Sequence, residues 1–408
     1  MSAPSIPPAI SRKRRLTIAD IRDGFTTQPV SNLLWNQEFL NCYDLGGCHP
    51  ICLGDIFKDG RYKVVRKLGW GNSSTVWLAQ DTITDILVAL KISRADMSSA
   101  SRREVLALEA LHASKVTSKL MPALYDDFVH NGPNGAHQCI VMQVLGPSLK
   151  TVIESFYSER IDLEDLLRLA RQVLDATATL HEAGFAHGDI DCSNIVFSVN
   201  NLANVSNEAF IIALGKLKTA ELLRIDASPL DDKHLPEQLV GAAKWDDWID
   251  EDEEDLRFVD VCDLFRVGDQ VPSSEAEHNA ICPPETIFED TFDYRVDLWR
   301  AGHVIYSLIF ASCPFMYMGD DDSLVNQMID FIGALPPEWE SRRQRTREAS
   351  SDPIETSCDA NSTTELETRF KEDVPEPELA PLLPVIQGLM RFRPQDRISA
   401  RDALALLD

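Results

Sequence analysis

The chain has 408 residues, of which 44% are hydrophobic and 25% are charged, as is ordinary for a globular protein. A chain of this length is expected to divide into two lobes or domains. Its formal net charge of −26 argues against direct binding to nucleic acids. The acidity favours a basic protein partner, or it only keeps the protein soluble.

The sequence predicts neither a membrane segment nor a disulfide or zinc framework. The longest apolar runs, such as residues 304–312, are far too short to cross a bilayer, and the N-terminus lacks an apolar signal core. The nine cysteines include no repeated C-x-x-C pair, which argues against both frameworks. We therefore expect a soluble protein of the cytoplasm and nucleus, with no membrane contact.

Residues 1–42 are predicted to form a flexible N-terminal extension. A basic cluster at residues 12–15 lies within it. Such a cluster is either a nuclear-import signal or a solvated basic tail, and both interpretations stay open.

Two alternating apolar runs joined by glycines occupy residues 68–78 and predict a β-hairpin whose backbone approaches phosphates. A strand at residues 88–91 follows and would direct Lys91 to the phosphates of a nucleotide. In the helix expected at residues 101–113, Glu104 is the predicted ion-pair partner of Lys91, and Glu109 is the alternative.

A buried strand is predicted at residues 139–142, and the free backbone groups that follow it would receive an adenine. The pattern thus predicts binding of ATP. The expected nucleotide-binding residues are Leu68, Gly69, Gly71, Ser74, Val76, Ala89, Lys91, Gln143 and Leu145.

Residues 187–194 are predicted to form a loop between an amphipathic helix and a short strand. An Asp followed five positions later by an Asn is typical of phosphoryl-transfer sites, where Asp189 would orient a substrate hydroxyl and Asn194 would hold Mg²⁺. Asp260, on an apolar strand downstream, is the second expected magnesium ligand. Taken alone, the loop is equally an ordinary polar turn, so its partners elsewhere in the chain decide between the two.

Three further polar residues continue the same pattern downstream of the loop. Asp297 begins a buried helix and is expected to brace the backbone of the loop, while Glu285, after two prolines, is expected to pair with Arg397. The order of these pieces predicts an α+β, bilobal protein-kinase fold. A small β-rich N-lobe is expected at 43–145 and a larger helical C-lobe at 146–408.

Two segments are predicted to be additions to this core. Residues 198–256 form an insertion with a helical stretch at 209–223 and an acidic end at 245–255. The acidic end is a solvated tract, or it is a docking strip for an arginine-rich partner. Residues 340–374 are expected to be a polar, flexible insertion.

Three stretches narrow the assignment: G-G-C-H-P at residues 46–50, L-G-W-G at 68–71 and S-T-V-W-L at 74–78. Together they resemble the SR-protein kinases, and residues 335–339 resemble the divergent fungal members. The resemblance implies transfer of the γ-phosphate of ATP, with Mg²⁺, to serine in basic, Arg/Ser-rich, splicing-factor-like proteins. It implies a catalytic set of Asp189, Lys91 and Glu104, and the metal ligands Asn194 and Asp260.

The chain departs from that family at four positions near the site, Asp191, Val261, Cys262 and Gly188. Asp191 stands where the family has a lysine, and an acid facing the transferred phosphate would repel the developing negative charge. Cys262 replaces a glycine of the metal-binding loop, and Gly188 replaces an arginine.

These departures leave two alternatives to an active protein kinase. The first is a catalytically impaired pseudokinase that acts as a scaffold, and the five retained polar residues argue against it. The second is a small-molecule kinase, because H-G-D-x-x-x-x-N at residues 187–194 also resembles the loop of the aminoglycoside and choline kinases. Glu285 with Arg397 argues against that alternative, since they build a platform for peptides.

Overall fold

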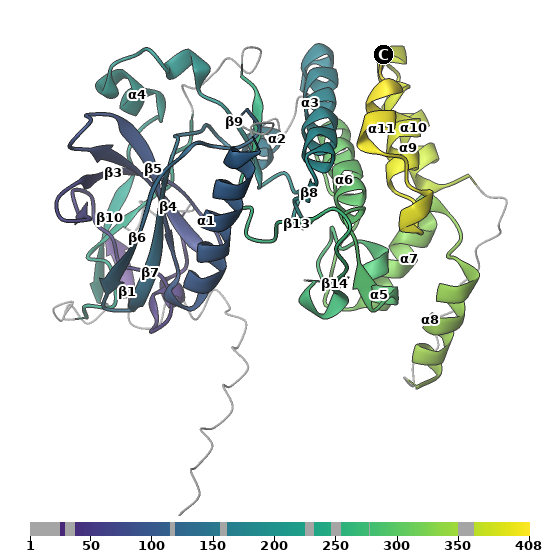
Figure 1. Ribbon diagram of the computed structural model, residues 1–408, viewed down its shortest axis with the longest axis horizontal. Coiled ribbons are helices and arrows are strands. Elements are labelled where there is room, and N and C mark those ends of the chain that lie inside the picture. The colour runs from purple at the N-terminus through teal and green to yellow at the C-terminus, as the bar shows by residue number, and fades with distance from the viewer. Residues whose placement is uncertain are drawn as a thin grey trace, which may run out of the picture.

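The computed structural model describes residues 25–28, 37–114, 119–155, 161–224, 232–245, 254–276, 278–349 and 363–408. A β-rich lobe with helix α1 (Ser98–Ala113) lies on one side, and a helical lobe lies on the other (Figure 1). This arrangement agrees with the predicted α+β, bilobal fold.

The N-lobe is a six-stranded antiparallel sheet in the order β2-β3-β4-β5-β7-β6. Along β3 the buried Tyr62 and Val64 alternate with the exposed Lys63, as a strand with one face on the core requires. Beneath the sheet these residues pack with Trp77 and Leu90. The strands are β2 (Ile56–Phe57), β3 (Tyr62–Trp70), β4 (Ser74–Asp81), β5 (Leu87–Ser93), β6 (Leu124–Gly132) and β7 (Gly135–Met142).

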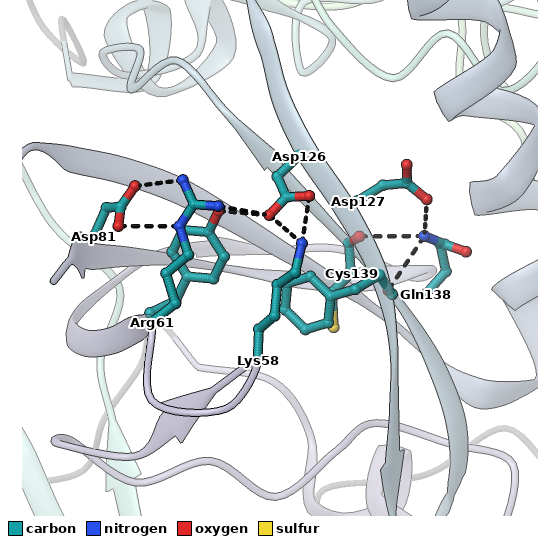
Figure 2. Close-up of polar contacts among 9 residues, drawn as sticks. Lys58, Arg61, Asp81, Asp126, Asp127, Gln138 and Cys139 are labelled. Atoms are coloured by element: carbon teal, nitrogen blue, oxygen red, sulfur yellow. Dashed lines mark hydrogen bonds and ion pairs between the residues drawn. The ribbon is translucent and has the colours of Figure 1, made fainter. Parts of the chain in front are cut away.

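A polar network joins the two ends of this sheet (Figure 2). Asp126, on the last strand, accepts hydrogen bonds from Lys58 Nζ at 2.6 Å and from the Tyr62 hydroxyl at 2.7 Å. Arg61 pairs with Asp81 at 2.8 Å and also reaches Asp126 at 3.4 Å. A register shift between Leu124 and Asp126 marks a bulge, which re-aims a side chain. These contacts tie the turn between β2 and β3, and the start of β3, to β6 at the opposite edge of the sheet.

The C-lobe is built around helix α6 (Val296–Phe310), which is buried along almost its whole length. Gly302 allows α10 to approach closely, because a Cβ there would lie 2.5 Å from Met390 Cγ. The other helices are α2 (Leu149–Ser155), α3 (Leu163–Glu182), α5 (Pro284–Phe288), α7 (Asp321–Ile332), α8 (Pro337–Ala349), α9 (Glu365–Asp373), α10 (Leu382–Leu389) and α11 (Ala400–Ala405). None of the described helices is long and apolar enough to span a bilayer.

Short strand pairs hold the polar loops between the lobes. β8 (Phe185–Ala186) pairs with β13 (Phe265–Arg266), and β9 (Ile195–Phe197) pairs with β12 (Leu256–Phe258). The first loop, 187–194, lies between β8 and β9, and the second, 259–264, lies between β12 and β13. The pairing thus brings together two loops that the sequence places far apart. A further pair, β14 (Val271–Pro272) with β15 (Thr291–Phe292), lies downstream.

The insertion differs from the prediction of one helix at 209–223. Helix α4 (Asn207–Ala213) ends early, and residues Thr219–Arg224 form strand β10 between β1 (Phe25–Gln28) and β11 (Gln238–Val240). Gly215, at φ +79°, stops the helix, and Arg66 Nη1 bonds its carbonyl at 2.6 Å. Long-range pairing with β1 then selects a strand for a sequence that local propensity read as helix.

Part of the N-terminal extension is ordered, contrary to the predicted flexibility. Strand β1 belongs to it, and Glu38 forms an ion pair with Lys67 of β3, both side chains being buried. The Tyr43 hydroxyl donates to the same carboxylate. A lysine at 1% exposure requires such a partner, so this contact fixes the extension on the sheet. The basic cluster at 12–15 lies outside the described residues.

The two predicted polar tracts are also more structured at their ends than expected. Glu254, counted in the acidic run, is fully buried and accepts hydrogen bonds from the backbone N–H groups of Asn200 at 2.7 Å and Asn201 at 2.9 Å. The middle of that run, 246–253, lies outside the described residues. In the 340–374 segment, Arg343 of α8 pairs with Asp322 at 2.6 Å, and Thr364 caps α9. Residues 350–362 lie outside the described part.

Buried His303 on α6 should make the fold sensitive to acid. It is 2% exposed, packs against Phe315, and its ring nitrogens have no hydrogen-bond partner among the described residues. Burial, and then the charge of Arg300, lower its pKa to about 3. The unfolded state therefore binds a proton as the pH falls through about 6.5, while the folded state binds none until about pH 3.

We expect this histidine to cost about 2 kcal/mol of folding free energy at pH 5 relative to pH 8. The variant His303→Leu should lack that part of the acid-induced loss. Urea unfolding of both proteins at the two pH values measures the difference. Equal losses in wild type and variant would contradict the assignment.

Candidate active site

The predicted ion pair between strand β5 and helix α1 is present. Lys91 Nζ lies 2.7 Å and 2.8 Å from the two carboxylate oxygens of Glu104, and both side chains are buried. The alternative, Glu109, is exposed. Glu104 lies on the buried face of α1 together with Val105 and Leu108, whereas Glu109 lies on the exposed face and cannot reach Lys91.

Asp260 completes this cluster. Its Oδ1 lies 3.2 Å from Lys91 Nζ. Although burial disfavours the charged ammonium, Glu104 and Asp260 together raise the pKa of Lys91 above its usual value. In turn, the Lys91 charge lowers the pKa of Asp260, so this carboxylate is anionic at neutral pH.

The backbone places Asp260 beside the first loop. Its φ is +60°, a left-handed conformation that an aspartate tolerates better than most residues. Just before it, the Val259 N–H donates to the Asn194 carbonyl at 2.9 Å, which extends the β9–β12 pairing. Asn194 and Asp260, separated by 66 positions, are thereby held next to each other.

Asp297 braces the loop at residues 187–194 as predicted. Its fully buried carboxylate accepts the N–H of His187 at 2.7 Å and the N–H of Gly188 at 2.9 Å. Gly188 has φ +83°, and a Cβ there would lie 2.5 Å from the Asp263 carbonyl oxygen. An arginine therefore does not fit at this position, which is the physical reason for the glycine.

Asp189 and Asn194 form a second cluster. Asn194 Nδ2 donates to the Asp189 carboxylate Oδ2 at 2.8 Å and to the Asp189 carbonyl at 2.9 Å. The Asp189 side chain stays 36% exposed, so a substrate hydroxyl can approach it. Because both bonds use the nitrogen of the amide, the Asn194 Oδ1 is not engaged by them and is available to a cation as far as the described residues show.

The donor set fits the predicted magnesium ion. Mg²⁺ prefers oxygen ligands and is held in kinase sites by one or two protein side chains plus phosphates. The Oδ1 of Asn194 and the anionic carboxylate of Asp260 are such ligands, from adjoining loops.

The expected nucleotide residues line the sheet side of the site. Ala89 is buried and lies opposite Met142 in the strand register, and Leu68 and Val76 are partly buried against the same core. A Cβ on Gly69 or Gly71 would meet open space, so ligand could approach either backbone.

The remaining nucleotide residues sit differently. Ser74 is buried at the start of β4, opposite Ser93, rather than at the tip of the hairpin. Gln143 donates its backbone N–H to Ala123 at 2.9 Å, so only its carbonyl is left to receive an adenine amino group. Leu145 is buried just beyond it.

The platform pair predicted from sequence is present in the C-lobe. Arg397 forms a two-pronged ion pair with Glu285, at 2.5 Å and 2.7 Å, and both side chains are almost completely buried. Arg397 also donates to the carbonyls of Arg295, Arg391 and Phe392, which satisfies its other N–H groups.

Comparisons with known proteins agree with this geometry. Residues 62–207 match the family described as protein kinase domain. A crystallised kinase domain is similar over 88% of this chain and 99% of its own, with a TM-score of 0.59 at 17% identity. The chain has the protein kinase fold.

The similar curated proteins are kinases, and they bear out the predicted resemblance to the SR-protein kinases. Protein kinase dsk1 of Schizosaccharomyces pombe is 36% identical over 42% of this chain and 32% of its own length. Serine/threonine-protein kinase SKY1 of Saccharomyces cerevisiae is 36% identical over 42% of this chain and 24% of its own. Serine/threonine-protein kinase SRPK of Physarum polycephalum is 25% identical over 89% of this chain and 88% of its own. The matched stretch thus spans less than a third of the first two relatives.

Within the kinase fold, Asp191 stabilises a turn of its own loop, a role that the sequence analysis did not predict. Its Oδ1 accepts the Ser193 N–H at 2.8 Å, and its carbonyl accepts the Asn194 N–H at 2.9 Å. The carboxylate therefore builds the turn that carries Asn194, in the manner of an Asx-turn. One of its oxygens is engaged there and is not free to face a phosphate.

The other departures cause no strain in the loop that is predicted to bind metal. Cys262 does not adopt a left-handed backbone, so it does not need the freedom of a glycine. Val261 is fully buried, and burial raises the pKa of the Cys262 thiol above its usual value. The loop accepts both side chains.

One residue of the site was missed by the sequence analysis. Arg300 Nη1 donates to the Asp189 Oδ1 at 2.5 Å. The signal was its spacing from Asp297, three residues earlier on α6, because residues at that spacing share a helix face.

Proposed function

We propose that this chain is an ATP-dependent protein serine/threonine kinase. The observation that carries the proposal is the convergence of two polar clusters, Lys91 with Glu104 and Asp260, and Asp189 with Asn194. Burial of Lys91 and Glu104 costs free energy that packing alone would not require. A scaffold without catalysis would not need to keep this pair.

Each cluster has a chemical task. Lys91 binds phosphate oxygens of ATP, and Glu104 holds its ammonium in place. A bound Mg²⁺ supplies positive charge to the phosphates, and Asn194 and Asp260 are the residues that would hold it. Asp189 accepts the hydrogen bond of the substrate hydroxyl and orients its oxygen for in-line attack.

For the substrate we propose serine in basic, Arg/Ser-rich, splicing-factor-like proteins. The net charge of −26 would attract an arginine-rich chain and speed its association. A further similar protein, SRSF protein kinase 3 of Homo sapiens, is 38% identical over 40% of this chain and 30% of its own. Such substrates would place the protein in the cytoplasm and nucleus.

Transfer of labelled phosphate from ATP with Mg²⁺ tests both levels of the proposal. An Arg/Ser-repeat peptide should be phosphorylated on serine at a kcat/KM at least about tenfold above that for a peptide with glutamate in place of arginine. Lys91→Met, which loses one phosphate donor, should reduce turnover by about 10²-fold or more.

The other outcomes separate the alternatives. Nucleotide binding without transfer to either peptide would support a pseudokinase. Transfer to choline or an aminoglycoside, with none to peptides, would support a small-molecule kinase. Equal rates on both peptides would keep the kinase and reject the proposed substrate class.

A further inference from the structure

A cation lies against Asp189, but it does not come from the catalytic loop. Arg300, on helix α6, reaches Asp189 Oδ1 from 111 positions away. Two positions after Asp189, where a loop cation would stand, the chain has Asp191, and that carboxylate bonds the Ser193 N–H. The positive charge beside the carboxylate is thus supplied by a helix.

Helix α6 fixes the loop at two points on one face. Asp297 holds the backbone N–H groups of His187 and Gly188, and Arg300, one turn later, holds the Asp189 side chain. The helix itself is buried along almost its whole length, so it is a rigid support. Positions of the loop backbone and of its carboxylate are therefore set by a single element.

The two contacts restrain the Asp189 carboxylate but leave part of its hydrogen-bond acceptor capacity available. Its Oδ1 accepts from Arg300 and its Oδ2 accepts from Asn194. A carboxylate has about four lone-pair sites, so acceptor sites are left for a substrate hydroxyl. With 36% of the side chain exposed, those sites can be reached.

A contact made for stability alone would look different. The Arg300 side chain is 8% exposed, and its Nε hydrogen has no acceptor among the described residues. Burying a guanidinium with an unsatisfied donor costs free energy, and an apolar side chain of the same volume would avoid that cost. By contrast, the buried Arg397 in the same lobe has acceptors for its N–H groups, including the Arg391 carbonyl for its Nε.

We propose that Arg300 is a positioning residue that supplies from helix α6 the positive charge that Asp191 cannot supply from the catalytic loop. The proposal rests on the proposed kinase function. Arg300 holds Asp189 in the orientation that receives the substrate hydroxyl and balances its negative charge during transfer. Asp191 is then free to build the turn that carries Asn194.

The test is a double-mutant cycle on the full-length chain, with kcat and KM measured for ATP and for the Arg/Ser-repeat peptide. Arg300→Met keeps the volume of the side chain and should lower kcat by about 10²-fold, with the KM for ATP nearly unchanged. Arg300→Lys, which keeps the charge, should lose less. In an Asp191→Lys background, Arg300→Met should lose less than about tenfold, because the loop then carries its own cation.

Folding and general charge effects have separate controls. Thermal unfolding and binding of a non-hydrolysable ATP analogue show whether each variant is folded. Arg401 on α11 forms exposed ion pairs with Asp175 and Glu182 on α3, away from the site. Arg401→Met removes these pairs, and its kcat should equal that of wild type.

Three results would overturn the assignment. A faster Arg300→Met would mean that the arginine restrains the base, and an unchanged kcat would mean that it has no role in turnover. An equal fall in kcat on Arg300→Met in the wild-type and Asp191→Lys backgrounds would mean that Arg300 does not replace a cation of the loop. A wild type that binds nucleotide and transfers no phosphate would instead overturn the kinase function, and the Arg300 proposal with it.

Discussion

Replacement of Asp189 by asparagine should reduce phosphate transfer by about 10²–10⁴-fold, the usual contribution of a positioned acid–base group. Asparagine has nearly the shape of aspartate but is neutral, so it cannot accept a proton or balance Arg300 as the carboxylate does. Its NH₂ group would also face Asn194 Nδ2 or Arg300, where two donors would meet. The KM for ATP should change little, since Asp189 lies apart from the Lys91 cluster. Steady-state kinetics with the Arg/Ser-repeat peptide measures both parameters.

Asp191→Asn is the matched control for this variant. The asparagine oxygen can still accept the Ser193 N–H, so the turn should persist, and turnover should stay within about threefold of wild type. Full transfer by Asp189→Asn would show that Asp189 is not the residue that orients the hydroxyl. A large loss in Asp191→Asn would show that the Asp191 charge itself acts in the reaction.

Replacement of Arg397 by methionine should lower the free energy of unfolding by about 3–5 kcal/mol, the usual cost of leaving one partner of a buried ion pair alone. Glu285 would remain fully buried without its cation. The carbonyls of Arg295 and Phe392 would also lose a donor. Urea unfolding of wild type and variant at pH 7.5 measures the change.

Two companion variants test the cause of that loss. The double variant Glu285→Leu with Arg397→Met leaves no uncompensated charge and should recover most of the stability. Arg393→Met removes an exposed ion pair with Glu338 in the same segment and should change stability far less. A loss as large in Arg393→Met as in Arg397→Met would contradict the role of burial.

The sequence was sufficient for those parts of the site that local pattern encodes. The helical spacing of apolar residues in α1 distinguished Glu104 from Glu109, because only residues on the buried face can reach Lys91. The order and spacing of the polar motifs predicted the Asp297 brace and the Glu285–Arg397 pair, and both are present. The two-lobed α+β fold followed from the same order.

Local sequence pattern gave wrong predictions where contacts with residues distant in sequence determine the structure. Residues 219–223 have helical character, but Thr219–Arg224 forms a strand because β1, far away in sequence, pairs with it. Glu38 looked like part of a flexible extension, and its buried contact with Lys67 cannot be read from either neighbourhood. Glu254 looked like one more solvated acid in a charge run, and it is a buried acceptor for a turn.

The site shows the same division between sequence and tertiary structure. The sequence alone determined which polar side chains are present, in which order, and on which helix faces, because motif spacing and helical period are local properties. Only the tertiary structure decided what each charge faces. It placed Gly188 where a Cβ would meet the Asp263 carbonyl, and it brought Arg300 to Asp189. The contact between Arg300 and Asp189 depends on how a helix and a loop 111 positions apart pack together, and no local periodicity carries that information.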